Sequence, residues 1–339
     1  MENTDFDKIS ELLQKPRKIL ITTHSNPDGD AIGASLALYG YLVKKGHRVH
    51  VMIPDPDPVF LHWMPFHEHI MVFSMNQEEC LRVINEAELI FCIDYNGISR
   101  LSHASVYITE TKAIKILIDH HVQPENDFDM QISVTKTSST SELIYEFIAD
   151  SGDRHLIDKS IAECIYTGII TDTGSFSYAC NYEKTFIIIA ALHKTGLDGE
   201  HIHRLVYDTY SENRLRLLGY SISEKLVVLP KYNAAYISLS KEDLEKFDHQ
   251  IGDTEGIVNY ALSIKDINLA ALFTEKEDMV KVSLRSKGNF SVNEIARKFF
   301  KGGGHTNAAG ANCYISLEET IRIFLSMLPQ YKDKLKSVY

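Results

Sequence analysis

Residues Lys18–Gly33 read KILITTHSNPDGDAIG, and this stretch decides how the first half of the chain folds. Apart from Lys18, its first six residues are apolar or β-branched, which predicts a buried strand over Lys18–Thr23. Polar and turn-forming residues follow at once, and apolar residues at helical spacing then predict a helix over Ala31–Lys45. A buried strand that passes through a short polar loop into a helix is typical of a parallel α/β sheet.

The same alternation of strands and helices continues through the first half of the chain. Further strands are predicted at Arg48–Ile53, Leu89–Asp94 and Ile114–Asp119, and further helices at Gln77–Ala87, Glu142–Ala149, Ile161–Ile170 and Glu183–His193. The serine and threonine residues at 138–141 are predicted to cap the helix that follows them. This order predicts an α/β fold with a doubly wound, mostly parallel sheet.

The second half has a different order of elements. A strand at Ala234–Leu239 precedes two short helices, and the segments NLAALFTE and MVKVSLRS then form a predicted hairpin. A helix at Val292–Phe300 leads to a glycine triplet, and this mixed order predicts a second, smaller α+β domain. We therefore expect a first domain at residues 1–195, a helical connector at 196–228 and the smaller domain at 229–339.

Composition narrows the class of protein. The chain has 339 residues, of which 44% are hydrophobic and 24% charged, as in ordinary globular proteins. The net charge of -11 does not favour a duplex-DNA-binding protein, which usually presents a basic face. The five cysteines are scattered and form no CxxC pair, which predicts reduced thiols. With no apolar leader and no apolar run of membrane-spanning length, the expected location is the cytoplasm, without membrane contact.

Carboxylate and imidazole side chains follow three of the predicted strands, at the point where each strand ends. They are His24, Asp28 and Asp30 after the first strand, Asp94 at the end of the third, and Asp119, His120 and His121 at the end of the fourth. Asp172 lies at the end of a predicted helix. Because functional groups of a parallel sheet collect beyond the carboxyl ends of its strands, we expect these side chains to converge.

The residue types indicate which ions they would bind. Carboxylate oxygens and imidazole nitrogens favour Mn²⁺, since Mg²⁺ rarely takes imidazole ligands, and Mg²⁺ and Co²⁺ are the alternatives. Four clustered carboxylates would repel one another without metal, and two divalent cations would neutralise them. Two such ions can activate a water molecule and clamp a phosphate group, so the expected reaction is hydrolysis of a phosphate ester or anhydride.

The segments that carry these residues resemble a known family. HSNPDGD, the strand end at Asp94, the Asp119-His120-His121 triplet and ITDTGSF resemble the four motifs of DHH-superfamily phosphoesterases, which include RecJ exonucleases. VSLRS at Val282–Ser286 and GGGH at Gly302–His305 resemble the substrate-binding DHH-associated domain. The resemblance covers nearly the whole chain and is strongest to the bacterial bifunctional oligoribonucleases (nanoRNases) that are also 3'-phosphoadenosine 5'-phosphate phosphatases.

The resemblance implies that the first domain is the metal-binding catalytic domain, and it implies a role for each of the motif residues there. One metal ion would be held by His24, Asp28 and Asp94, and the other by Asp30, Asp94, His120 and Asp172. Asp119 would orient His120, and His121 would lie near the scissile phosphate and assist the leaving group. Asp119 as a simple strand-end residue remains an alternative.

The resemblance also implies which residues of the second domain bind substrate. They are Arg285, Ser286, Gly302, Gly303, Gly304 and His305. The fork of arginine donors fits a phosphate, and glycines let backbone N–H groups approach an anion. A simple turn at the glycines is the alternative. Two other features stay open: Arg100 would reach the phosphate or form a surface ion pair, and His67-Glu68-His69 is interpreted as a surface loop.

The expected substrates are short oligoribonucleotides, 3'-phosphoadenosine 5'-phosphate, or both. The expected partners are short single-stranded RNA or DNA and nucleotides, with no duplex DNA, and a homodimer stays open. One alternative is a phosphodiesterase of cyclic or linear dinucleotides. Another is an inorganic pyrophosphatase or polyphosphatase, although such enzymes usually carry consecutive Arg and Lys in the second domain. A non-catalytic nucleotide-binding regulator is the third alternative, against which the intact ligand set argues.

Overall fold

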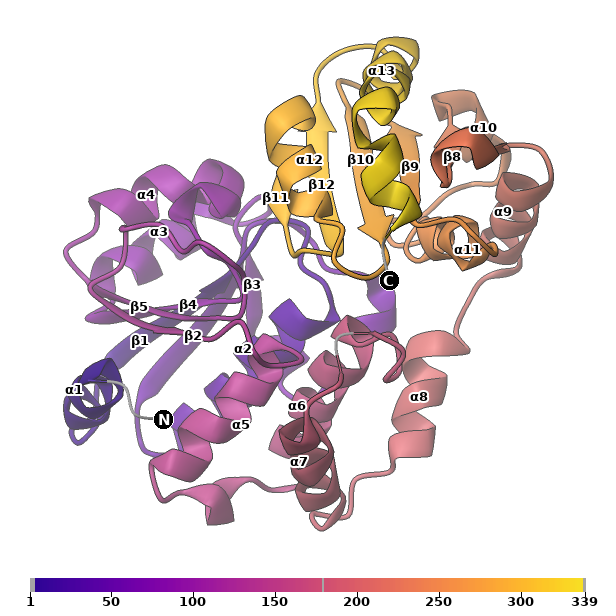
Figure 1. Cartoon of the computed structure of the whole chain (residues 1–339). Helices are drawn as coiled ribbons and strands as arrows, with labels where there is room; N and C mark the ends of the chain where they lie inside the picture. The colour runs from indigo at the N-terminus through magenta and orange to yellow at the C-terminus, as the bar shows by residue number, and fades with distance from the viewer. Residues whose placement is uncertain (1–3, 179, 338–339) are drawn as a thin grey trace. The chain divides into compact units, whose positions relative to one another are not determined.

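The computed structural model describes residues 4–178 and 180–337. The chain folds into two compact units, Met1–Thr209 and Tyr210–Tyr339, each with a six-stranded sheet of its own (Figure 1). The predicted connector is helical, and its two helices belong to different units: α8 (Gly199–Tyr207) to the first and α9 (Glu212–Ser223) to the second.

The sheet of the first unit is parallel throughout, with strand order β3-β2-β1-β4-β5-β6. The strands are β1 (Lys18–Thr23), β2 (Arg48–Ile53), β3 (Ile70–Val72), β4 (Leu89–Ile93), β5 (Ile114–Asp119) and β6 (Met130–Ser133). The chain builds outward from β1 to β3 and then returns to place β4 on the other side of β1. The switch point between β1 and β4 is where a doubly wound sheet opens a crevice for ligands.

Helices cover both faces of this sheet. They are α1 (Thr4–Leu12), α2 (Gly29–Lys44), α3 (Gln77–Glu86), α4 (Ser105–Glu110), α5 (Thr140–Asp150), α6 (Lys159–Asp172) and α7 (Glu183–His193), besides α8. Ile19 and Ile21 of β1 point into the core that holds α2, α5 and α6, while Leu20 between them joins the core beneath α3 and α4. This alternation along one buried strand confirms the doubly wound α/β fold (Figure 1).

Two glycines let α2 and α6 pack unusually close together. A Cβ on Gly33 of α2 would lie 2.6 Å from the Cys164 carbonyl oxygen, and one on Gly168 of α6 would lie 2.7 Å from Asp30 Oδ1. A side chain at Gly33 would therefore require the backbone to move, and one at Gly168 would displace the side chains of Ser141 and Asp30. The close approach places the first turn of α2, which carries Asp30, against the last turns of α6, which end at Asp172.

The second unit is built on a mixed sheet with the order β11-β12-β10-β9-β8-β7, in which β8 and β9 are parallel and the other pairs antiparallel. Its strands are β7 (Leu226–Leu229), β8 (Ala234–Leu239), β9 (Leu269–Glu275), β10 (Val280–Ser286), β11 (Gly303–Gly304) and β12 (Ala308–Cys313). Its other helices are α10 (Lys241–Lys246), α11 (Ile257–Ser263), α12 (Val292–Phe300) and α13 (Leu317–Lys336). The smaller α+β domain is thus confirmed.

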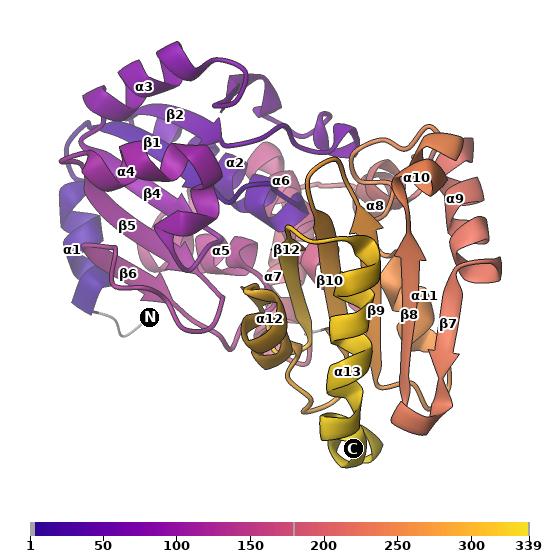
Figure 2. The ribbon, with the colours of Figure 1, turned by 90° about the horizontal axis from the view of Figure 1, so that it is seen from above.

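Alternate residues of β8 and β9 pack into two separate cores. Ala271 and Phe273 of β9 pack with α12 and α13, whereas Ala270 and Leu272 face the core that includes α9, α10 and α11. Figure 2 shows α12 and α13 on one face of the strands and α11 on the other. On the α11 side the second core does not extend to β10, where Lys281, Ser283 and Arg285 are only half-buried, so this part of the sheet is accessible to ligands.

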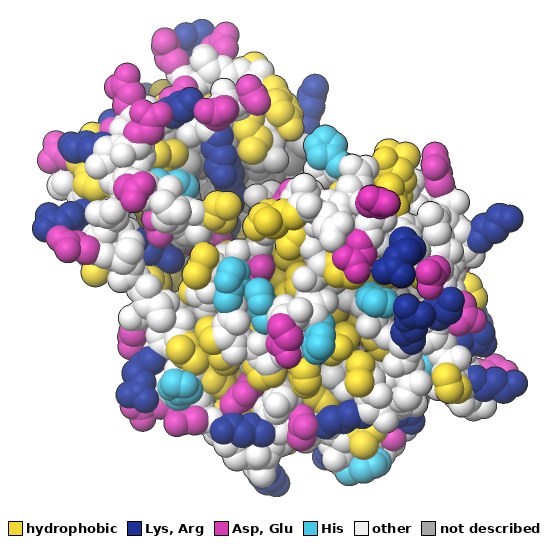
Figure 3. All heavy atoms as spheres, turned by 180° about the vertical axis from the view of Figure 1, so that it is seen from behind, with side chains coloured by type: hydrophobic (Ala, Val, Ile, Leu, Met, Phe, Trp, Pro, Cys, Tyr) yellow, Lys and Arg dark blue, Asp and Glu magenta, His cyan; other side chains and the backbone are white. Residues whose placement is uncertain are grey.

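Surface charge is mixed rather than segregated. On the face shown in Figure 3, Lys and Arg side chains are interspersed with Asp and Glu, and no continuous basic strip crosses either unit. Within residues 4–178 and 180–337, no helix is long and apolar enough to cross a membrane.

Candidate metal centre

Three neighbouring strands deliver the predicted ligands to one edge of the first sheet. The strands β1, β4 and β5 lie side by side, and at their carboxyl ends stand His24, Asp94 and Asp119 respectively. His120 and His121 continue directly from β5. The cluster forms at the switch point because parallel strands all end on the same side.

The first group of ligand atoms lies between β1 and β4. Single ligand atoms of His24, Asp28 and Asp94 all lie within 4.8 Å of one another. His24 Nε2 is 3.6 Å from Asp94 Oδ2. This separation is too long for a hydrogen bond, but it suits two donors that share one ion.

The second group lies on the other side of Asp94. Ligand atoms of Asp30, His120 and Asp172 are also within 4.8 Å of one another. His120 Nε2 is 3.8 Å from Asp30 Oδ2, 3.4 Å from Asp172 Oδ2 and 3.5 Å from Asp94 Oδ1. Asp94 therefore turns one oxygen to each group, and the structure brings all six predicted ligands together around it.

Helix ends hold the carboxylates in place. Asp28 caps α2 by accepting the Asp30 and Ala31 N–H groups, each at 3.1 Å. Asp30 accepts the backbone N–H groups of Thr140 (2.7 Å) and Ser141 (2.9 Å) at the start of α5. The positive end of that helix therefore faces Asp30.

Thr140 is a site residue that the sequence did not reveal. Its hydroxyl donates to Asp94 Oδ1 at 2.7 Å and so fixes the carboxylate that faces both groups. The serine and threonine run at 138–141 was interpreted only as a helix cap, which Ser139 indeed provides. A polar run of this kind beside a sheet edge rich in carboxylates is the signal that was available.

The backbone at Asp94 is also distinctive. Asp94 has φ of 64°, and Asn26, in the loop after β1, has φ of 51°. Aspartate and asparagine tolerate the left-handed region better than other residues, although at some cost. The sharp turn at Asp94 carries its carboxylate back over the end of the sheet, and such backbone conformations cluster at functional sites.

The electrostatics of the cluster favour bound cations. Burial raises the pKa of Asp30 to about 7. Burial, and then the neighbouring Asp30 and Asp28, raise the pKa of Asp94 well above its usual range. Burial lowers the pKa of His24 and His120, so both imidazoles are neutral and able to bind metal. Divalent cations would replace the protons that these carboxylates otherwise retain, so the donor set fits a metal centre.

Asp119 is hydrogen-bonded to His121, whereas the expected partner was His120. Its Oδ1 is 2.7 Å from His121 Nδ1, so the hydrogen bond joins Asp119 to His121 and not to His120. The two imidazoles follow one another along the chain and their rings are inclined by 77°, so they face in different directions. Burial raises the pKa of Asp119 to about 6 and lowers that of His121, which leaves an ionised carboxylate beside a neutral ring near pH 7.

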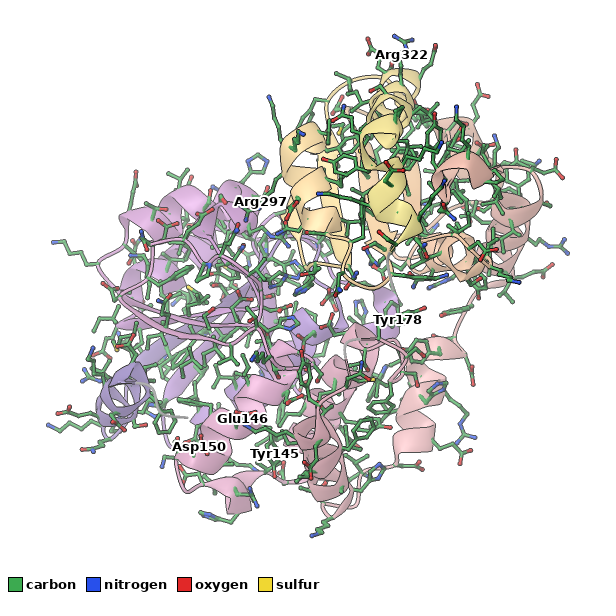
Figure 4. The ribbon with its side chains drawn as sticks, in the orientation of Figure 1. Tyr145, Glu146, Asp150, Tyr178, Arg297 and Arg322 are labelled. Atoms are coloured by element: carbon green, nitrogen blue, oxygen red, sulfur yellow. The ribbon has the colours of Figure 1, made fainter. Side chains whose placement is uncertain are left out.

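The predicted substrate-binding residues of the second unit lie at one end of its sheet. Arg285 pairs in register with Ala308, and Ser286 N donates to the Asn307 carbonyl oxygen at 3.0 Å, which brings β10 to the loop after β11. Arg285 is half-buried. Arg297 of α12 and Arg322 of α13, in contrast, are exposed (Figure 4).

For two of these residues, Ser286 and Gly304, contacts within the second unit already explain why the residue is present. The Ser286 hydroxyl is buried, donates to the Phe290 carbonyl oxygen at 2.5 Å and accepts from Asn307 Nδ2 at 3.0 Å. This geometry favours a structural role for Ser286. Gly304 has φ of 145°, and a Cβ there would lie 2.5 Å from the Ala308 carbonyl oxygen. The turn into β12 thus requires this glycine, whatever the loop binds.

The other members of the loop are less constrained. A Cβ on Gly303 would meet only Asn293 Oδ1, at 3.7 Å. Gly302 packs against Gly310 and Ala311 of β12. His305 is half-buried, and its backbone N–H donates to the Ala308 carbonyl oxygen at 2.7 Å. Gly303 is therefore the position at which the need for glycine is least explained by packing.

A doubly wound sheet with this carboxylate and imidazole cluster at its switch point, followed by a smaller mixed-sheet unit, defines a metal-dependent phosphoesterase. Residues 18–169 match the family model described as DHH family, N-terminal domain, and residues 231–331 match the DHHA1 domain. The chain belongs to the DHH family of phosphoesterases and is a hydrolase that acts on phosphate ester bonds.

Similar proteins extend over nearly the whole chain. It is 31% identical, over 95% of its length and 97% of the relative's, to a probable bifunctional oligoribonuclease and PAP phosphatase of Streptococcus mutans. A crystal structure of an exopolyphosphatase-related protein from Bacteroides fragilis matches with 43% identity and a TM-score of 0.92, over 98% of both chains. A cyclic-di-AMP phosphodiesterase of Bacillus subtilis is 24% identical over 95% of this chain but 49% of its own length.

Proposed function

We propose that the protein hydrolyses phosphodiester bonds of short oligoribonucleotides, roughly two to five nucleotides long, and the 3'-phosphate of 3'-phosphoadenosine 5'-phosphate. The observation that carries the proposal is the position of Asp94, whose two oxygens each lie about a ligand–ligand distance from a different histidine, at 3.6 Å and 3.5 Å. The substrate class follows from the similarity of the whole chain to an oligoribonuclease and PAP phosphatase.

Two Mn²⁺ ions are the cofactors that we propose, with His24, Asp28 and Asp94 holding one and Asp30, Asp94, His120 and Asp172 the other. Bound divalent ions would supply an activated water and offset charge on the phosphoryl oxygens. The imidazole in each group favours Mn²⁺ over Mg²⁺, and Co²⁺ fits the same donors. Thr140 and the start of α5 hold the carboxylates in position for either ion.

We propose that the Asp119–His121 pair delivers a proton to the leaving oxygen: Nε2 of His121 would take up the proton that the attacking water loses and then donate it to that oxygen. With Asp119 ionised, Nδ1 of His121 carries the proton of their 2.7 Å hydrogen bond, which fixes the orientation of the ring. Burial lowers the pKa of His121 most, and the neighbouring His120 and Arg100 lower it further. Arg100 is thus close enough to act electrostatically at the cluster, and its carbonyl oxygen accepts the Ser25 N–H at 2.8 Å. We propose that Arg100 attracts the substrate phosphate.

In the second unit we propose that Arg285, with backbone groups at Gly303, binds the part of the substrate that does not react. Arg285 is half-buried, so its guanidinium is held more firmly than the exposed Arg297 and Arg322. The Arg285 Nη1 donates to the Leu284 carbonyl oxygen at 3.0 Å, and a guanidinium forms strong, often bidentate hydrogen bonds with phosphate.

The test is hydrolysis of a panel of substrates by the purified protein. The panel contains a 5'-labelled RNA dinucleotide, 3'-phosphoadenosine 5'-phosphate, cyclic-di-AMP, pyrophosphate and polyphosphate, each with Mn²⁺, Mg²⁺, Co²⁺ or EDTA. We expect metal-dependent turnover of the dinucleotide and of the mononucleotide, fastest with Mn²⁺, while pyrophosphate remains intact. Rapid turnover of pyrophosphate or polyphosphate alone would reject the proposed substrates and keep the metal chemistry.

A second candidate is hydrolysis of cyclic or linear dinucleotides, which the similarity to a cyclic-di-AMP phosphodiesterase favours. It needs the same metal centre, so the first unit does not discriminate between the two. A preference for cyclic-di-AMP over the linear dinucleotide would favour this candidate.

A cytoplasmic location and a homodimer stay predictions from the sequence.

A further inference from the structure

The loop between β2 and β3 carries a second cluster of metal-binding side chains. Residues 54–69, PDPDPVFLHWMPFHEH, contain two short 3₁₀ turns, η1 (Val59–Leu61) and η2 (His67–His69). Between them the chain reverses at Phe66, which has φ of 70°. This path brings together three residues, Asp57, His62 and His67, which we call the loop cluster.

The geometry of the loop cluster suits one ion. Its three ligand atoms lie within 4.8 Å of one another. His67 Nε2 is 2.9 Å from Asp57 Oδ2, and His62 Nε2 is 3.6 Å from Asp57 Oδ1. With zinc–ligand bonds of about 2.0–2.1 Å, donors around a tetrahedral zinc ion are roughly 3.3 Å apart, and both distances bracket that value.

A hydrogen-bonded pair alone does not explain this arrangement. It accounts for Asp57 and His67, but the 3.6 Å from His62 to the other carboxylate oxygen exceeds hydrogen-bond length. The His62 and His67 rings are also only 4.4 Å apart, inclined by 34°. Both imidazoles thus direct Nε2 towards the same carboxylate, as ligands of one ion do.

The loop cluster is separate from the metal centre but connected to it. Asp57 is buried, His67 is half-buried and His62 is exposed, so the cluster opens to solvent on the His62 side. Asp55 accepts the N–H of Asn26, which lies between the ligands His24 and Asp28, at 3.3 Å. The Pro65 carbonyl oxygen accepts from Cys164 Sγ of α6 at 3.6 Å. The loop therefore touches the ligand-bearing turn after β1 and the helix that ends at Asp172.

We propose that Asp57, His62 and His67 bind a third divalent cation, zinc, with water as its fourth ligand. Two imidazoles and one carboxylate, with a solvent-facing fourth position, form a donor set that zinc accepts readily. The ion fixes the 54–69 loop beneath the turn that carries the first metal ligands. This proposal rests on no assumption about the substrate or about the proposed phosphoesterase activity.

Zinc content separates this site from the metal centre. The full-length protein and its His62→Ala variant are dialysed against zinc in the presence of excess Mn²⁺, and both metals are then measured by mass spectrometry. His69→Ala is the matched control, because His69 is a histidine of the same loop whose ring packs on Tyr39 and which is outside the cluster. We expect the wild type and His69→Ala to bind one more zinc ion per chain than His62→Ala, with equal manganese.

Thermal unfolding provides the second readout. In excess Mn²⁺, zinc should raise the unfolding temperature of the wild type and of His69→Ala but not of His62→Ala. All three should unfold at similar temperatures in EDTA, since His62 is exposed. Loss of a direct ligand should weaken zinc binding at least as much as the roughly 10- to 100-fold caused by losing an outer-sphere partner. Equal zinc content and equal stabilisation in the wild type and His62→Ala would overturn the proposal, whatever the substrate panel shows.

Discussion

The two units of the molecule differ in whether packing and hydrogen bonding alone explain their motif residues. At the metal centre, the fold buries Asp30, Asp94 and Asp119 within one cluster, and burial raises the pKa of all three. Packing alone does not explain why the fold accepts the free-energy cost of burying these three carboxyl groups. In the second unit, Ser286 and Gly304 are accounted for by hydrogen bonding and backbone packing within β10–β12. A motif of buried charges therefore indicates function more directly than a motif of glycines.

Asp94→Asn should produce the largest effect, because it removes the negative charge of the side chain that faces both ligand groups. We expect kcat to fall by about a thousandfold, equivalent to about 4 kcal/mol, on any phosphate ester that the enzyme cleaves. Asparagine tolerates the left-handed backbone and relieves the repulsion between carboxylates, so the unfolding temperature in EDTA should not fall. Retention of near wild-type turnover would show that Asp94 does not connect two metal ions.

Thr140→Val should weaken metal binding without removing a ligand. The variant loses the 2.7 Å hydrogen bond to Asp94 Oδ1, and loss of such a partner typically lowers metal affinity by about 10- to 100-fold. Thr167→Val is a matched control, because the buried Thr167 hydroxyl donates only within its own helix, to Glu163, at 2.8 Å. Manganese titration by calorimetry measures the difference, and equal affinities in the two variants would remove Thr140 from the site.

Arg285→Ala tests whether the second unit binds substrate at all. Loss of a charge-assisted contact should raise KM for the RNA dinucleotide by at least about tenfold. Turnover of bis-p-nitrophenyl phosphate, which is too small to use that contact, should be unchanged. The exposed Arg297, replaced by Ala, is the control for loss of charge in the same unit. Equal losses on both substrates would exclude a length-measuring role for Arg285.

Two alanine substitutions distinguish the structural glycine from the candidate binding glycine. Gly304→Ala should destabilise the protein by about 1–3 kcal/mol, because of its positive φ and the close Ala308 carbonyl. Gly303→Ala should leave the free energy of unfolding within about 1 kcal/mol but raise KM for the dinucleotide. Chemical denaturation and kinetics together decide the matter; if Gly303→Ala changes neither quantity, the loop is only a turn.

The smallest expected effect is a pH dependence of metal stabilisation. Burial lowers the pKa of the site histidines, so they are neutral in the fold at about pH 6.5 and above, and their protonation in the unfolded chain affects the metal-free and metal-bound proteins alike. The pKa of Asp30 rises from 3.8 to about 7 on folding, so the metal-free protein loses stability as pH increases through 7. Bound metal replaces that proton. The rise in unfolding temperature on adding Mn²⁺ should therefore be larger at about pH 8 than at about pH 6.5, and the reverse order would contradict this origin.

Much of the fold could be predicted because local patterns agreed with the tertiary structure. The strand at Lys18–Thr23 and the helix at Val292–Phe300 have the predicted bounds. The strand β12, with the sequence AAGANC, was not predicted, since small residues carry little strand signal and pairing with β10 and β11 holds them extended. The edge strand β6 has only four residues and gives a similarly weak pattern.

The site was predictable where one residue type at a strand end was enough, as at His24 and Asp94. It was not predictable where side-chain direction decides the contact. Asp119 bonds to His121 because of how two consecutive rings leave β5, which spacing alone does not specify. Asp57 lies near His62 and His67 in the loop cluster because of the turn at Phe66, and no sequence motif predicts that turn.

The central claim is that two metal ions share Asp94, and anomalous diffraction from crystals grown with Mn²⁺ tests it most directly. The account predicts two manganese peaks about 3.5–4 Å apart, one beside His24 and Asp28 and the other beside Asp30, His120 and Asp172, with one Asp94 oxygen on each or a single oxygen bridging both. A single peak, or two peaks that do not share Asp94, would contradict it.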